Sequence, residues 1–138
     1  MKNFNKFAVV VAAAAIALSG AVATPAAASG TGTAVGSGGT LVSIYVDGTY
    51  NRVNSLEVGV LYPVVPYGSI CNGRATGTGT RTTGAAWSKT WGQYSGCLFA
   101  SWASKTSVGL DFKSSTVMRG SAYHDGMTNS GRPTVAIQ

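Results

Sequence analysis

The sequence predicts an all-β domain over residues 40–138, built as a small antiparallel β-sandwich or a partly closed barrel. Short runs of alternating apolar residues are separated by turn dipeptides about every ten residues, which is typical of β-proteins. After the first residues, no window places apolar residues at helical spacing. The chain is also rich in Gly, Thr and Ser, which are poor helix formers.

The first 28 residues have the features of a secretory signal peptide. Lys2 and Lys6 precede an uncharged apolar run from Phe7 to Leu18, and small residues ending in Ala26-Ala27-Ala28 follow. The apolar run is shorter than the roughly 20 residues that a spanning helix needs. We therefore expect a secreted, extracellular protein, cleaved near Ala28, with no stable membrane insertion.

The rest of the chain divides into a linker and one domain. Residues 29–39, SGTGTAVGSGG, bury too little apolar surface to offset their ordering entropy, and we expect a flexible tether there. Alternating residues predict strands around 42–46, 56–62, 98–102, 108–112 and 135–137. Pro63 and Pro66 should end the second of these strands. The dipeptides Asp47-Gly48, Asn72-Gly73 and Asp125-Gly126 each suit a two-residue hairpin turn.

Cys71 and Cys97 are the two cysteines of the chain. An even count in a small exported protein predicts one disulfide. On the chain-entropy relation such a bridge stabilises the fold by about 3.5 kcal/mol. A zinc site needs four ligands, and only His124 could join the pair, so we expect neither a metal nor another cofactor.

Titratable groups are scarce, which disfavours catalysis. Asp47 and Asp125 belong to predicted turns, and Glu57 and Asp111 should face solvent on strands rather than face each other as a glycosidase pair. A small hydrolase using His124 as base stays open as a third hypothesis. No G-x-S-x-G motif is present to hold a nucleophile, and an exposed imidazole is expected just before a turn.

The charge and the glycine-rich segment exclude two further classes. The formal net charge is +6, and without Lys2 and Lys6 eight basic and four acidic residues leave +4, spread along the chain. This is too weak a bias for a nucleic-acid-binding protein. The segment from Gly77 to Gly84 lacks the G-K-[ST] ending of a phosphate-binding loop. Its threonines at period two, from Thr76 to Thr82, indicate one face of a solvated strand.

An aromatic cluster at residues 87–94 is the candidate binding site. Trp87 and Trp91 are four residues apart, so a continuous strand would place both indoles, with Lys89 between them, on one face. They either fill the core or form a platform that stacks on sugar rings. Trp102, within an apolar strand, is assigned to the core. The remaining candidate binding residues are Tyr94, Arg74 and Arg81, and the two arginines with Lys89 could converge on an anionic polymer.

Three function classes follow. The first is a non-catalytic, monomeric secreted module that binds a polysaccharide or an anionic cell-envelope polymer. The second is an antimicrobial protein or enzyme inhibitor that acts on a protein target through a loop near 63–74. The third is the small hydrolase. The Ala-rich leader, the single Cys pair and the Gly/Thr-rich strands resemble small disulfide-pinned β-proteins that bacteria export, a likeness of architecture that implies no functional residue.

Overall fold

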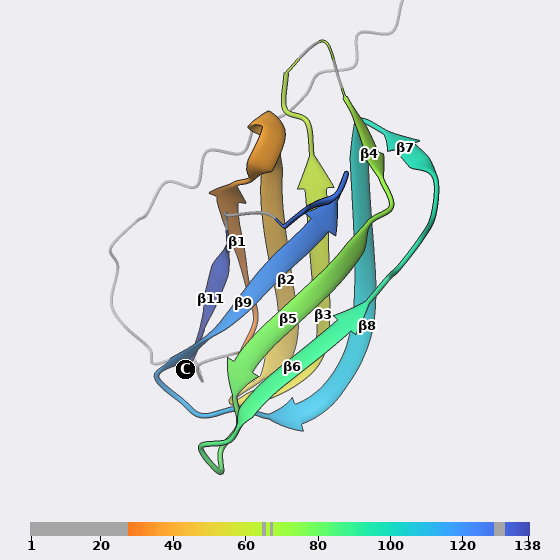
Figure 1. The fold of residues 1–138 in the computed structure, drawn as a ribbon. Helices are drawn as coiled ribbons and strands as arrows, with labels where there is room; N and C mark the ends of the chain where they lie inside the picture. The colour runs from red at the N-terminus through yellow and green to blue at the C-terminus, as the bar shows by residue number, and fades with distance from the viewer. Residues whose placement is uncertain (1–27, 65, 67, 129–131) are drawn as a thin grey trace, which may run out of the picture.

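Two antiparallel sheets packed face to face form the fold in the computed structural model, which describes residues 28–64, 66, 68–128 and 132–138 (Figure 1). The strands are β1 (Gly30–Val35), β2 (Leu41–Thr49), β3 (Arg52–Leu61), β4 (Ser69–Cys71), β5 (Arg74–Thr80), β6 (Ala86–Trp91), β7 (Cys97–Phe99), β8 (Ser101–Asp111), β9 (Thr116–His124), β10 (Met127–Thr128) and β11 (Thr134–Ile137). A 3-10 turn, η1 (Ser37–Gly39), joins β1 to β2. The predicted all-β class is confirmed. The predicted signal peptide lies outside the described residues except for Ala28.

The first sheet has the strand order β1-β2-β3-β8. Its edge strand β1 pairs antiparallel with β2 over its whole length. The prediction of a flexible tether over residues 29–39 is therefore wrong for Gly30–Val35. Gly30 and Gly32 point inward, where β11 of the other sheet lies close, and a Cβ on Gly32 would stand 2.4 Å from the carbonyl oxygen of Thr134. The backbone pairing of β1 supplies the stabilisation that its small side chains do not.

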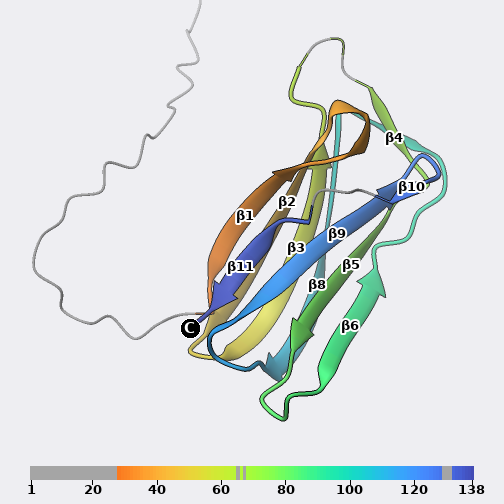
Figure 2. The ribbon, with the colours of Figure 1, turned by 60° about the vertical axis from the view of Figure 1, so that its left-hand side comes forward.

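The second sheet has the order β10-β9-β5-β6, and β11 also pairs with β9 (Figure 2). Strand β5 alternates threonine with glycine, so that Thr76 and Thr78 point outward and Gly77 points into the molecule. A Cβ on Gly77 would lie 2.3 Å from Cδ2 of Leu56, and one on Gly120, directly opposite in β9, would lie 3.0 Å from Val58. The glycine pair therefore lets the two sheets approach closely.

The core fills the space between the sheets. Its fully buried large side chains are those of Phe112, Ile44, Leu56, Ile70, Met118, Ile137, Val42, Val46, Val53, Val58 and Val60. Trp102 is 8% exposed and belongs to the same cluster, which confirms its assignment to the core. The burial of this apolar surface is the main favourable term in the stability of the fold.

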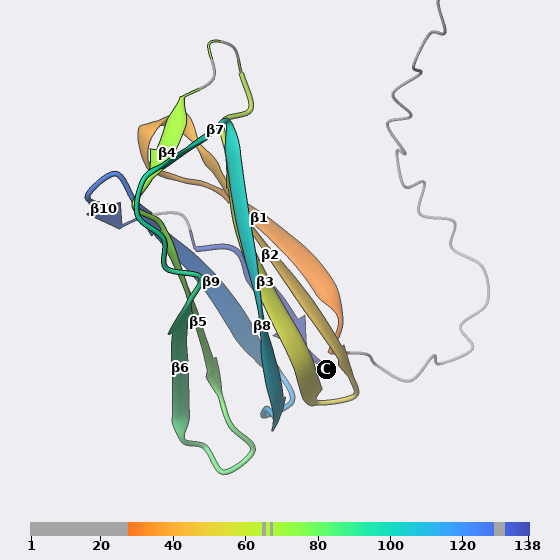
Figure 3. The ribbon, with the colours of Figure 1, turned by 90° about the vertical axis from the view of Figure 1, so that its right-hand side faces the viewer.

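A short ribbon of β4 and β7 stands at one end of the sandwich (Figure 3). The predicted disulfide is confirmed: Cys71 and Cys97 are bonded and occupy directly opposite positions of the two strands. Two backbone hydrogen bonds hold the base of the loop between β3 and β4. The N–H of Tyr62 donates to the carbonyl oxygen of Ala100, and the N–H of Ala100 donates to the carbonyl oxygen of Gly68. Both hydrogen bonds are 2.9 Å long.

One of the three predicted hairpin turns is confirmed. Asp125 and Gly126 both have positive φ and connect β9 to β10. The turn predicted at Asp47-Gly48 lies further along the chain, at residues 50–51, because β2 continues through a bulge at Asp47-Gly48. The Asn72-Gly73 prediction is wrong as a hairpin, because this dipeptide bends the chain from β4 directly into β5.

Candidate functional site

The outer face of the second sheet carries hydroxyl and guanidinium groups in rows. Two rows run across the strands: Thr90, Thr76 and Ser121, and then Ser88, Thr78, Arg119 and Thr134. The hydroxyl oxygens of Thr76 and Thr90 are 3.1 Å apart and share a hydrogen bond. We call this surface the arginine–hydroxyl face, and define it by Arg74, Thr76, Thr78, Thr80, Ser88, Thr90, Arg119, Ser121 and Tyr123. It can both donate and accept hydrogen bonds over a wide area.

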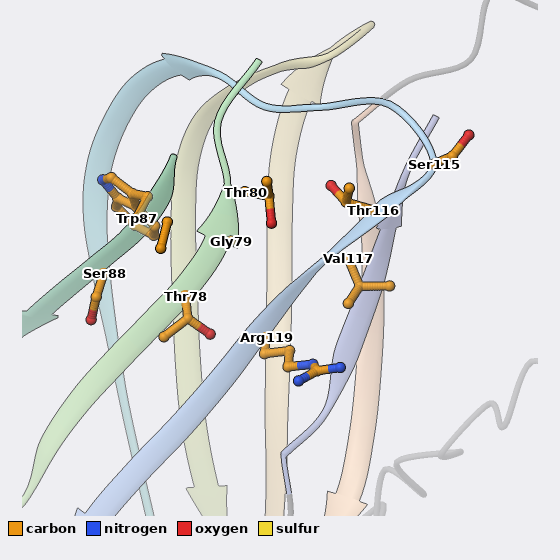
Figure 4. A pocket seen from close by; sticks show the side chains of 10 residues that line it. Thr78, Gly79, Thr80, Trp87, Ser88, Ser115, Thr116, Val117 and Arg119 are labelled. Atoms are coloured by element: carbon orange, nitrogen blue, oxygen red, sulfur yellow. The ribbon is translucent and has the colours of Figure 1, made fainter. Parts of the chain in front are cut away.

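Three shallow hollows follow β5 and β9 along this face. The largest, about 490 Å³, is lined by residues of β5, β6 and β9, Trp87 among them, and by Ser115 just before β9 (Figure 4). A second hollow, about 240 Å³, shares Thr78 and Arg119 with the largest one, so Arg119 stands at the junction of these two hollows. A third hollow, about 430 Å³, lies at the other end of β5 and is lined by Arg74, Tyr94 and Tyr123 among others. Together they describe an extended, open surface rather than one enclosed pocket.

The positive charge of this face has no acidic counterpart among the described residues that line the hollows. None of the four acidic residues of the chain lines a hollow, although the charge of Asp125 acts on Tyr94 in the hollow around Arg74. Asp47 and Glu57 are on the first sheet, Asp111 pairs with Arg52 at 3.3 Å, and Asp125 is in the β9–β10 turn. The guanidinium of Arg74 lies over the ring of Tyr123, 4.2 Å from its centre, a cation–π contact that orients the charge.

Trp87, Lys89 and Trp91 lie on one face of β6, as the spacing predicts, and this face turns toward the first sheet. Both indoles are half-buried and pack against the core. Trp87 meets Phe112 edge to face, with ring centres 5.3 Å apart. Trp91 donates its indole N–H to the carbonyl oxygen of Ser104 at 3.0 Å. The two tryptophans therefore have the core arrangement, and their indoles do not form an outward stacking platform.

The structure does not bring Arg74, Arg81 and Lys89 together. Arg74 and Arg81 stand at opposite ends of β5, and the Arg81 side chain donates to the carbonyl oxygen of Asp111 at 3.0 Å. The Lys89 ammonium donates to the carbonyl oxygen of Ser107 at 2.9 Å, on the edge strand of the other sheet. Of these three, Arg74 alone contributes to the arginine–hydroxyl face.

Tyr94 links the disulfide end of the molecule to the core. Its hydroxyl donates to the carbonyl oxygen of Ile70 at 2.7 Å, and its ring packs against Trp102 at 5.5 Å. A Cβ on Gly73 would lie 2.5 Å from the Tyr94 ring, so this position holds glycine to admit the ring. Burial raises the pKa of the Tyr94 hydroxyl, and the negative charge of Asp125 raises it further.

His124 is not exposed, contrary to the expectation from its place before a turn. Its side chain is fully buried, and Nδ1 lies 2.7 Å from Oδ2 of Asp125. The other carboxylate oxygen of Asp125 accepts the backbone N–H of Cys71 at 3.1 Å. The imidazole thus belongs to a network that fixes the β9–β10 turn against β4. Such burial leaves it out of reach of a substrate in this structure.

The remaining chemistry of the described residues is sparse. Glu57 lies opposite Lys105 on the outer side of the first sheet, and Asp111 pairs with Arg52, so the two carboxylates do not face each other. No group of three or more potential metal ligands occurs among the described residues. Within the same residues, no helix has the length and apolar character needed to cross a membrane.

Arg119 and Ser121 were missed as candidate site residues. Their signal was the alternation in 117–123, where every second residue is Val, Arg, Ser and Tyr and the residues between them are small or apolar. That pattern predicts an outward face, but which strand lies beside it depends on the topology.

Neither a family model, nor a curated protein, nor a solved structure matches this chain.

Proposed function

We propose that this protein is an exported, non-catalytic β-module that binds a cell-envelope or extracellular polymer through its arginine–hydroxyl face. The observation that carries the proposal is the combination of guanidinium and hydroxyl groups on one surface without a carboxylate among the described residues that line its hollows. Guanidinium groups bind carboxylates, sulfates and phosphates with paired hydrogen bonds, and hydroxyl rows match the hydroxyls of sugars.

The shape of this face favours a polymer over a small molecule. Sites for small ligands are concave and enclose most of the ligand surface. Here two shallow hollows share Thr78 and Arg119, and a third lies at the other end of β5 around Arg74. An extended chain would contact all three hollows, whereas a small ligand would occupy only one and stay largely in solvent.

Export belongs to the same proposal. The basic, apolar and small-residue segments of residues 1–28 favour secretion with cleavage near Ala28. The Cys71–Cys97 disulfide fits an oxidising compartment. The buried His124 and the separated carboxylates weigh against the hydrolase alternative.

Retention on immobilised polymers tests the proposal. The purified protein should be retained on acidic polysaccharides or anionic cell-wall polymers and released by salt, because exposed charges are screened at high ionic strength. Arg119→Gln should weaken retention. Lys105→Gln is the matched control, since it removes one positive charge from the opposite outer face, beside Glu57. Equal retention of both variants would contradict the assignment of this face.

A second candidate function rests on the disulfide end of the molecule. Phe99 is 71% exposed, Val64 is 66% exposed, and Leu98 and Leu61 are exposed as well. Such an apolar surface favours contact with a protein partner, as in an antimicrobial protein or an enzyme inhibitor. Replacing Phe99 with Ser should abolish this activity in a growth or enzyme-inhibition assay, while polymer retention stays unchanged.

A further inference from the structure

Two arginines mark the ends of a track on the arginine–hydroxyl face. Arg74 of β5 lies opposite Tyr123 of β9, and Arg119 lies four residues before Tyr123 on the same strand. At the rise of an antiparallel strand, four residues correspond to about 14 Å. Thr76 and Ser121, which are also cross-strand neighbours, occupy the middle of this interval. The track therefore has positive charge at both ends and hydroxyl groups between them, and Arg132 adds a further positive charge at the hollow that Thr76, Ser121 and Arg119 line.

The side chains of the track favour a sugar chain over a nucleic acid as the ligand. Proteins that bind single-stranded nucleic acids stack successive bases on exposed aromatic rings. Between Arg74 and Arg119 the aromatic ring is that of Tyr123, and the guanidinium of Arg74 already covers it at 4.2 Å. Trp87 and Tyr94 also line hollows of this face, and their rings pack against Phe112 and Trp102. Hydroxyl groups of Thr76 and Ser121 offer hydrogen bonds to ring substituents of a sugar chain instead.

We propose that the ligand is an acidic polysaccharide whose chain runs along β5 and β9, with one acidic group at Arg74 and another at Arg119. This inference rests on the proposed function and adds the class of polymer, its direction and its two points of attachment. Each guanidinium can donate two parallel N–H···O bonds to a carboxylate or a sulfate. The hydroxyls between the arginines contact the sugars that connect the two acidic groups.

Attachment at two points makes affinity depend on chain length. An oligomer too short to span about 14 Å binds at one arginine at a time. A longer one binds at both, and its second contact forms at the high effective concentration that the first contact provides. We therefore expect an oligogalacturonate octamer to bind at least about tenfold more tightly than the dimer, a conservative figure for bivalent attachment.

Calorimetric titrations with oligogalacturonates of two to eight units test this inference on the purified protein. Arg74→Gln should reduce the affinity for the octamer about tenfold, to near that of the dimer, because bivalent attachment is lost. The same variant should reduce dimer affinity by no more than about twofold, since one of two single sites remains. Lys105→Gln, on the opposite outer face, should leave both affinities unchanged, and thermal melts verify that each variant is folded.

The other outcomes separate this inference from the proposed function. Equal affinity for the dimer and the octamer, both weakened by Arg119→Gln alone, would overturn the two-point track and leave polymer binding intact. Displacement of the octamer by DNA of equal charge concentration would overturn the assignment to sugars. If long polygalacturonate did not bind but another polymer did, and Arg119→Gln weakened that binding, only the polymer class would be wrong. Loss of binding to every polymer tested would remove the proposed function as well.

Discussion

Trp91 donates its indole N–H to the backbone carbonyl oxygen of Ser104 across the open side of the sandwich, 3.0 Å away. The two residues belong to β6 and β8, the edge strands of different sheets. Lys89 makes an equivalent bond to Ser107 at 2.9 Å. Side chains of one sheet thus satisfy backbone acceptors at the edge of the other, in a place where unpaired edges invite association with further chains.

Truncation of Trp91 should be costly because of this position. Trp91→Ala removes a half-buried indole from the core and is expected to lower the free energy of unfolding by about 3 kcal/mol, at the lower end for large aromatic truncations. Trp91→Phe keeps most of the packing but loses the hydrogen bond, at a cost of about 1 kcal/mol. Urea denaturation measures both. A loss below 1 kcal/mol for the alanine variant would revive the outward platform.

Gly77 should resist even the smallest side chain. Its Cβ would stand 2.3 Å from Cδ2 of the buried Leu56, so Gly77→Ala is expected to cost about 1–3 kcal/mol through overpacking. In a Leu56→Ala background the same change should cost less, because the truncated side chain leaves room. A double-mutant cycle measures this coupling, and strict additivity of the two changes would contradict the close approach of the sheets.

The raised pKa of Tyr94 predicts that the free energy of unfolding falls at alkaline pH. Its pKa is raised above 10.0 in the folded protein, first by burial and then by Asp125. At a pH between the unfolded and folded pKa values, the unfolded chain has released the Tyr94 proton and the native protein still holds it. The contribution of Tyr94 to the free energy of unfolding is therefore complete below pH 10 and declines as the pH rises further. Tyr94→Phe should show a shallower decline in denaturation titrations above pH 10. Parallel curves for the two proteins would contradict the assignment.

The disulfide should contribute measurably to stability. Replacing Cys71 and Cys97 together with Ser is expected to lower the free energy of unfolding by about 2–4 kcal/mol, because the unfolded chain gains freedom. Thermal melts of the oxidised protein and the double variant provide the comparison. Thiol titration under denaturing conditions is the control, and two free thiols in the native protein would refute the bridge.

One glycine–threonine pattern occurs twice in the chain, as Gly30-Thr31-Gly32-Thr33 and around Thr76–Thr80. Composition predicts a tether for the first and alternation predicts a strand for the second, yet both form strands with glycine turned inward. Low apolar content suggested disorder for the first. It could not reveal that another strand lies against those glycines, since that depends on which strands become neighbours.

The candidate site was predictable only in part, for the same reason. The outward threonine row and the common face of Trp87 and Trp91 follow from period-two alternation. Alternation does not say which of the two faces meets the opposite sheet, and for β6 that face carries the tryptophans. Burial of His124 likewise depends on its contact with Asp125 and on the packing of β4. Arg119 became a site residue only because β9 pairs with β5.

The most direct test of the arginine–hydroxyl face is a residue-resolved NMR titration of the purified protein with an oligogalacturonate octamer. The amide signals of Thr76, Thr78, Arg119 and Ser121 should shift in a saturable manner. Signals of Ser43 and Lys105, on the outer side of the first sheet, should stay in place. Shifts confined to that opposite face, or to the apolar end around Phe99, would contradict the account.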